Sequence, residues 1–195
     1  MVDLLVKAFP FAVGALIGAL ASFVVSTRVV PNLRNKEKAT MVLAELANAI
    51  RHFERSIQNL ESFQSEKRLG RRADYEKCKY SSSGFVGLSF ADLMGLPDKL
   101  SRDVMQMGLV YRNQNLEVDY VIGILDRSSE NDQERTAKFE AMAGLIERMR
   151  MIIDMSEALR RNVVFFSENT TALSANKEIP WSDDFYESGK RYDFD

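Results

Sequence analysis

The stretch "DKLSRDVMQMGLVYRNQNLEVDYVIGIL" (98–125) decides the fold class, because its apolar residues recur every three or four positions. This spacing places them on one face of an α-helix. The face is made up of Leu100, Val104, Met107, Tyr111, Gln114, Val118, Val121 and Leu125. Gln114 is the polar member, and a polar seam residue can fix helix register at some cost in stability. Pro97 predicts that the helix starts there, and the pattern ends at 126–129.

The same helical periodicity occurs on both sides of this stretch. Upstream, an apolar seam starts near Asn35, after the helix-disfavouring Pro31, and Gly70 predicts its C-terminal cap. The seam residues are Val42, Leu46, Ile50, Phe53, Ile57 and Leu60. Downstream, a wider apolar stripe begins after Asn131 and extends to Phe166. A stripe of that width indicates a helix that contacts two neighbours.

These patterns predict an all-α protein: an N-terminal transmembrane helix followed by an antiparallel bundle of three long helices, or four if 89–96 is also helical. The expected organisation is a transmembrane anchor at 1–30 and a basic juxtamembrane helix at 31–69. The next segments are a loop at 70–88 and the remaining bundle helices at 89–177. The chain ends in an acidic, aromatic tail at 178–195.

The anchor prediction comes from the run "FAVGALIGALASFVVST" (11–27). Residues 8–27 are twenty residues without a charge, and at about 1.5 Å per residue they match a bilayer core of roughly 30 Å. Basic residues that would contact lipid headgroups follow the run: Arg28, Arg34, Lys36 and Lys38. Since positive flanks stay in the cytoplasm, we expect the N-terminus outside and the body in the cytoplasm of a membrane such as the bacterial inner membrane.

Small residues occur at every fourth position of the run, namely Gly14, Gly18, Ser22 and Ser26. Such a strip allows close packing of membrane helices, so self-association or packing on another membrane protein is expected. A different interpretation is also open. The A-x-A pattern ending at Ala21 resembles a signal-peptidase site, and cleavage there would leave a secreted helical protein.

The tail "IPWSDDFYESGKRYDFD" (179–195) combines aromatic and acidic residues. Its aromatic residues are Trp181, Phe185, Tyr186, Tyr192 and Phe194. They are either a recognition segment for a partner or a segment that folds back on the bundle.

The sequence contains no motif for catalysis or for binding a metal or a cofactor. With one histidine (His52) and one cysteine (Cys78), neither a metal site nor a nucleophile with its base can be assembled, and no cofactor motif occurs. Cys78 lies between Lys77 and Lys79, and nearby cations can lower the pKa of a thiol, but a lone cysteine is most often inert, so a spare thiol is expected. Residues 28–72 carry ten basic and five acidic side chains. The two signs intermingle without a nucleic-acid-binding motif, so no nucleic acid is expected.

The sequence therefore predicts a non-enzymatic, single-pass membrane scaffold, tether or regulatory protein that acts through protein–protein contacts and needs no cofactor. Membrane lipid and another protein, or a second copy, are the expected partners. The alternative is an accessory subunit of a membrane transport or sensing complex.

Overall fold

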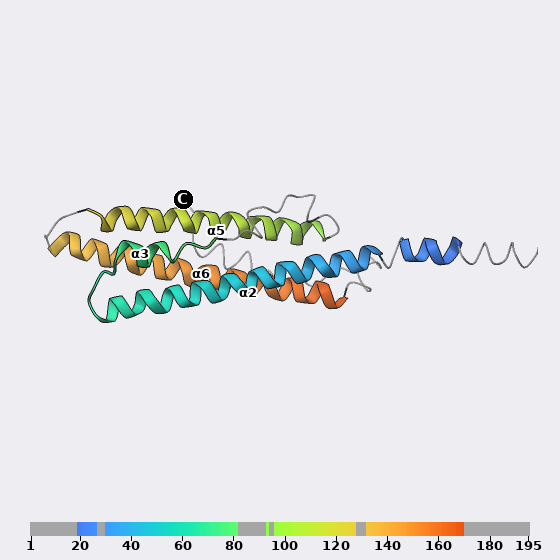
Figure 1. The fold of residues 1–195 in the computed structure, drawn as a ribbon, viewed down its shortest axis with the longest axis horizontal. Helices are drawn as coiled ribbons and strands as arrows, with labels where there is room; N and C mark the ends of the chain where they lie inside the picture. Colours follow the sequence, from blue (N-terminus) through green and yellow to red (C-terminus); the bar gives the residue numbers. More distant parts are fainter. Residues whose placement is uncertain (1–18, 27–29, 82–92, 94–95, 128–131, 170–195) are drawn as a thin grey trace, which may run out of the picture.

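A computed structural model describes residues 19–26, 30–81, 93, 96–127 and 132–169 of the chain. Its elements are α2 (Val30–Ser65), α3 (Arg72–Glu76), α5 (Asp98–Leu125) and α6 (Asp132–Asn169). Three long helices pack side by side with the short α3 against α5 (Figure 1). The described part of the chain is helical without strands, which confirms the predicted all-α class.

The predicted seams form the core. The α5 seam is buried from Leu100 to Val121, with Leu125 packed at its edge. The α2 seam residues from Val42 to Leu60 are buried as well. The wide stripe of α6 contacts both α2 and α5, as predicted. Burying three apolar faces against one another is the main driving force for this fold.

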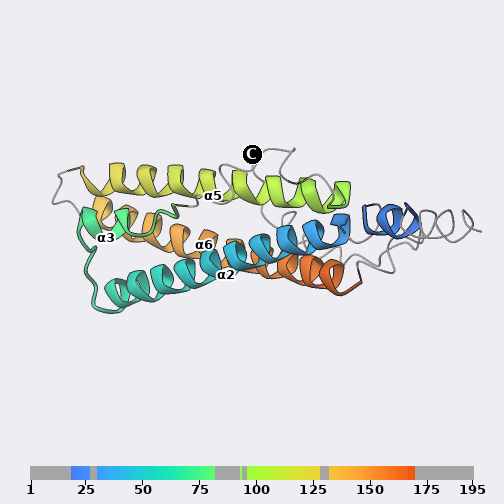
Figure 2. The same cartoon turned by 45° about the vertical axis from the view of Figure 1, so that its right-hand side comes forward.

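The chain directions correct the predicted antiparallel arrangement. Helix α6 is antiparallel to α5, since Leu125, Glu117 and Tyr111 contact Lys138, Arg148 and Ser156 in reverse order. It is also antiparallel to α2, but α2 and α5 run in the same direction (Figures 1 and 2). The physical reason lies in the described part of the connection between them: residues 72–80 run antiparallel to α5, since Arg72, Lys79 and Tyr80 contact Asp126, Asp119 and Asn115 in turn.

Both ends of α2 differ from the prediction. The helix begins at Val30 and includes Pro31, because a missing N–H costs little in a first turn. It ends at Ser65 in a Schellman motif in which Lys67 has a φ of 52°. The Arg68 N–H donates to the Phe63 carbonyl (2.9 Å) and the Lys67 N–H to that of Gln64 (3.1 Å). Lys67, and not Gly70, is therefore the cap residue.

The predicted membrane span lies mostly outside the described residues. Residues 19–26, which belong to its C-terminal half, are helical and extend away from the end of the bundle near the start of α2 (Figure 2). Among the helices that the structure describes, none is both long enough and apolar enough to cross a membrane.

Candidate functional site

An exposed apolar stripe runs along α5, on a different face from its buried seam. It consists of Met105, Leu109, Leu116 and Tyr120, and is called the α5 stripe below. Their exposed fractions are 41, 59, 61 and 64 %. Spacings of four, seven and four residues place all four side chains on one line of the helix. Large apolar side chains that are exposed along one face of a helix mark a candidate interaction surface.

Polar residues interrupt the α5 stripe at its centre. Arg112 and Asn113, both exposed, lie between the two apolar halves. Beyond the halves, Arg102 and Gly123 continue the same line of the helix and are also exposed. The surface therefore has apolar halves of similar size and a polar middle.

A bridging segment (72–81) fixes the orientation of α5 by packing between α5 and α2. Asn115 on α5 holds the Tyr80 backbone from both sides: the Tyr80 N–H donates to Asn115 Oδ1 (2.8 Å), and Asn115 Nδ2 donates to the Tyr80 carbonyl (2.9 Å). Arg72 pairs with Asp126 (3.0 Å) and Lys79 with Asp119 (2.6 Å). These contacts hold the segment along the C-terminal half of α5 and leave the α5 stripe uncovered.

Aromatic rings join the bridging segment to all three long helices. The Tyr80 ring lies 5.2 Å from Tyr111 and 5.6 Å from Phe53, between centroids. The Tyr80 hydroxyl donates to Glu45 Oε1 (2.9 Å) on α2. Burial is the main cause that raises the pKa of the Tyr80 hydroxyl, and the hydrogen bond to Glu45 raises it further. The Tyr111 hydroxyl is bonded to Ser156 on α6 (2.9 Å), and burial raises its pKa too. The cluster is a structural clamp, since its polar atoms are satisfied inside the fold.

Cys78 is a buried structural thiol, and its flanking lysines do not lower its pKa. Its side chain is 2 % exposed, and burial raises the pKa of the thiol to about 11. The flanking cations pair with carboxylates instead, since Lys79 pairs with Asp119 and Glu76, and Lys77 with Asp74. His52, half-buried beside it, has Nε2 3.2 Å from the Cys78 carbonyl. Neither residue is arranged for nucleophilic chemistry.

Two polar amides lie in the core of the bundle. Gln114 is 2 % exposed, and neither of its side-chain polar atoms has a hydrogen-bond partner within the described residues. The Nδ2 of Asn162 on α6 is likewise buried without a partner there. Buried polar groups of this kind cost stability and disfavour alternative helix registers.

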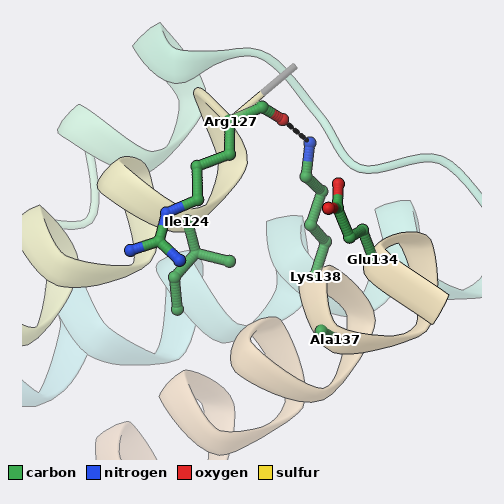
Figure 3. A pocket seen from close by; sticks show the side chains of 5 residues that line it. All are labelled: Ile124, Arg127, Glu134, Ala137 and Lys138. Atoms are coloured by element: carbon green, nitrogen blue, oxygen red, sulfur yellow. Dashed lines mark hydrogen bonds between the residues drawn. The ribbon is translucent and has the colours of Figure 1, made fainter. Parts of the chain in front are cut away.

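A hollow of about 100 Å³ lies where α5 and α6 meet near the end of α5. Figure 3 shows Lys138 reaching from α6 to the Arg127 carbonyl, with Glu134 beside it. Lys138 Nζ also donates to the Leu125 carbonyl (3.0 Å). The Lys138 ammonium thus donates hydrogen bonds to carbonyls at the end of α5 that have no partner within the helix. Its positive charge also stabilises the negative end of the α5 helix dipole. The hollow surrounds this helix cap.

A shallower hollow of about 300 Å³ on α2 is lined by Asn48, Arg51, His52 and Arg55. Its two guanidinium groups suit an anionic group on a partner. Arg51 is partly committed to its own helix, since it donates to the Ala47 carbonyl (3.1 Å) and to Asn48 Oδ1 (2.8 Å).

The predicted membrane-facing residues are only partly described. Ser22 and Ser26 are exposed on one helical segment, and the Ser26 hydroxyl donates to the Phe23 carbonyl (3.1 Å). Arg34 and Lys36 are exposed at the start of α2, and Lys38 is half-exposed. The remaining predicted site residues lie outside the described part: Gly14, Gly18, Arg28, Trp181, Phe185, Tyr186, Tyr192 and Phe194.

The α5 stripe was not predicted from the sequence, because the stronger seam on the same helix accounts for its periodicity. A second line of apolar residues, offset from the seam, was the available signal.

No cluster of three or more potential metal ligands occurs within the described ranges. No protein-family model, curated protein or solved structure matches this chain.

Proposed function

We propose that this chain is a non-enzymatic scaffold held at a membrane by a single span over residues 8–27, with its helical bundle on the cytoplasmic side. The observation that carries the proposal is the exposed, apolar helical segment at 19–26. Leu20 and Phe23 are 57 and 65 % exposed, and no part of the bundle covers them. Transfer of such side chains from water into lipid is favourable by about 25 cal/mol per Å².

The charge at the start of α2 supports the same proposal. Arg34 and Lys36 are exposed at the end of the bundle that adjoins the apolar segment. Cations in this position gain on the order of 1 kcal/mol each near anionic headgroups. The bundle itself supplies a rigid body with the α5 stripe as its contact surface.

Fractionation of cells that express the full chain tests the anchor. The chain is expected to stay in the membrane pellet after washes with high salt and with alkaline carbonate. Leu16→Arg with Ile17→Arg places two charges in the middle of the run and should move the protein to the supernatant, since each charge costs about 2.5–3.5 kcal/mol at the centre of a span. Leu16→Ile with Ile17→Leu is the matched control. Release of the unmodified chain by salt alone would refute the anchor.

The accessory-subunit alternative predicts that a multi-span membrane protein co-purifies with the chain. Purification in mild detergent followed by mass spectrometry should yield the chain without a stoichiometric multi-span protein. Recovery of one at a constant ratio would favour the accessory subunit over the free-standing scaffold.

A further inference from the structure

We propose that the hollow on α2 lined by Asn48, Arg51, His52 and Arg55 binds the phosphate group of a soluble molecule. This binding site goes beyond the proposed scaffold, and it does not depend on the anchor. Only the choice of a soluble source over a lipid headgroup rests on the proposed function. The charge of the hollow, its hydrogen-bond donors, its fixed side chains and its position on α2 favour this ligand.

Two guanidinium groups lie one helical turn apart in the hollow without a carboxylate to balance them. Arg51 and Arg55 are both exposed on α2, and like charges at this spacing destabilise a helix. Elsewhere in the bundle such groups are paired, as Arg148 is with Glu117 (2.9 Å). Within the described part of the chain, neither Arg51 nor Arg55 forms an ion pair. An anion bound between the two guanidinium groups would remove their repulsion.

The carboxylates nearest to these arginines along α2 do not neutralise the hollow. Glu45 accepts a hydrogen bond from the Tyr80 hydroxyl (2.9 Å). Glu54 directly precedes Arg55, and consecutive residues of a helix do not face each other. Neither glutamate lines the hollow, so it keeps the positive charge of its two guanidinium groups.

The side chains around the hollow offer hydrogen-bond donors. Asn48 Oδ1 already accepts from Arg51 Nη2 (2.8 Å), and this bond leaves Asn48 Nδ2 to donate. Asn48 Nδ2 and the Arg55 guanidinium have no hydrogen-bond partner among the residues that the structure describes. Phosphate oxygens accept such bonds, and a guanidinium group can donate two parallel ones. A lining of donors therefore suits an oxyanion and opposes a cation.

Arg51 and His52 are held in place without a ligand. Arg51 Nε donates to the Ala47 carbonyl (3.1 Å), so the guanidinium is fixed on the helix by two different bonds. His52 Nε2 lies 3.2 Å from the Cys78 carbonyl, and the ring packs 5.2 Å from that of Tyr80. Side chains that are already ordered lose less conformational freedom when a ligand binds. The wall of the hollow is therefore preorganised for a small anion.

The size and position of the hollow favour a soluble source of phosphate. Its volume of about 300 Å³ is roughly ten times the share of one water molecule in the liquid, so a phosphate group fits. Since α2 begins at Val30, Arg51 lies about 30 Å along the helix from its start. The field of charged headgroups decays over about 8 Å at physiological salt. Headgroups around the proposed anchor therefore do not reach the hollow.

The His52 ring provides a specific probe for this site, because His52 lines the hollow and is the one histidine of the chain. Full-length chain with isotope-labelled histidine is titrated in detergent with inorganic phosphate at constant pH and ionic strength. The His52 resonances should shift and saturate with phosphate and not with chloride. Arg55→Gln should raise the phosphate concentration at half-saturation about tenfold, because it removes charged hydrogen-bond donors. Arg112→Gln, at an exposed position of α5, is the matched control and should leave it unchanged.

Three results would overturn the site: a shift that does not saturate, an equal shift with chloride, or an equal midpoint in the Arg55→Gln chain. Phosphatidic acid added to the micelles separates the two sources of phosphate. It should neither shift the His52 resonances nor change their later response to inorganic phosphate. If phosphatidic acid shifts them and blocks that response, the hollow binds lipid headgroups and the soluble source is wrong. Carbonate extraction reports on the anchor separately, so a chain that stays in the pellet without binding phosphate refutes only the site.

Discussion

Gly70 shows how a single residue determines the path of the chain after α2. Its φ of +72° lies in a region that residues with a Cβ rarely adopt, and an added Cβ would lie 2.8 Å from the Phe63 ring. The turn brings the Tyr75 hydroxyl to the Leu69 carbonyl and to Met142 Sδ (3.2 Å) on α6. Gly70 therefore allows the bridging segment to pack against the bundle.

Gly70→Ala is expected to lower the free energy of unfolding by about 1–3 kcal/mol, because it adds backbone strain and a clash with Phe63. Urea unfolding followed by circular dichroism measures the change. Gly144→Ala, in an open helical position, should instead be neutral or stabilising by up to about 1 kcal/mol. Equal effects of the two substitutions would show that the Gly70 turn is not strained by a side chain.

Unlike Gly70, Gln114 is a residue whose replacement is expected to increase the stability of the fold. Gln114→Met should raise the free energy of unfolding by about 1 kcal/mol, because it replaces two buried polar atoms without described partners by an apolar chain of similar volume. The same urea experiment measures it. A loss of stability would mean that the amide has a partner beyond the described residues.

Among the elements, the end of α5 depends on a residue from α6. Lys138→Met keeps most of the side-chain volume but removes the ammonium that caps the Leu125 and Arg127 carbonyls. A hydrogen bond to a charged group contributes about 1.5–3 kcal/mol, so the expected loss in the free energy of unfolding is of that order. Amide hydrogen exchange should rise most in the last turn of α5. Unchanged exchange there would contradict the capping role.

The sequence predicted the long helices well and their connections poorly. Periodicity located the α5 seam and the double-faced α6, because burial repeats at every turn of a helix. It could not indicate that Tyr80 and Asn115 pair across 35 residues, since such contacts have no periodic pattern. Lys67 as a helix cap was missed because a lysine rarely has a positive φ. The raised pKa of Cys78 could not be predicted either, because neighbours in sequence do not reveal burial.

At the scale of the whole molecule, the clamp around the bridging segment makes the bundle sensitive to alkali. Burial raises the pKa of the Cys78 thiol from 9.0 to about 11, and it also raises the pKa values of the Tyr75, Tyr80 and Tyr111 hydroxyls. Above pH 9 the unfolded chain loses protons that the folded chain retains. The contribution of these groups to the free energy of unfolding is therefore constant below about pH 9 and decreases as the pH rises further.

An alkaline titration checks this dependence. Helical circular dichroism should persist through pH 9 and then decrease together with the rise of tyrosinate absorbance, because the buried hydroxyls ionise only on unfolding. Full ionisation of the tyrosines with unchanged helicity would contradict the buried clamp.

The central claim is that residues 8–27 alone hold the bundle at a membrane. Purified full-length chain reconstituted with protein-free lipid vesicles and centrifuged in a density gradient tests it most directly. We expect the chain to float with the vesicles, and to remain with them in high salt, while the chain with Leu16→Arg and Ile17→Arg stays at the bottom. Flotation of both chains alike, or of neither, would contradict the claim.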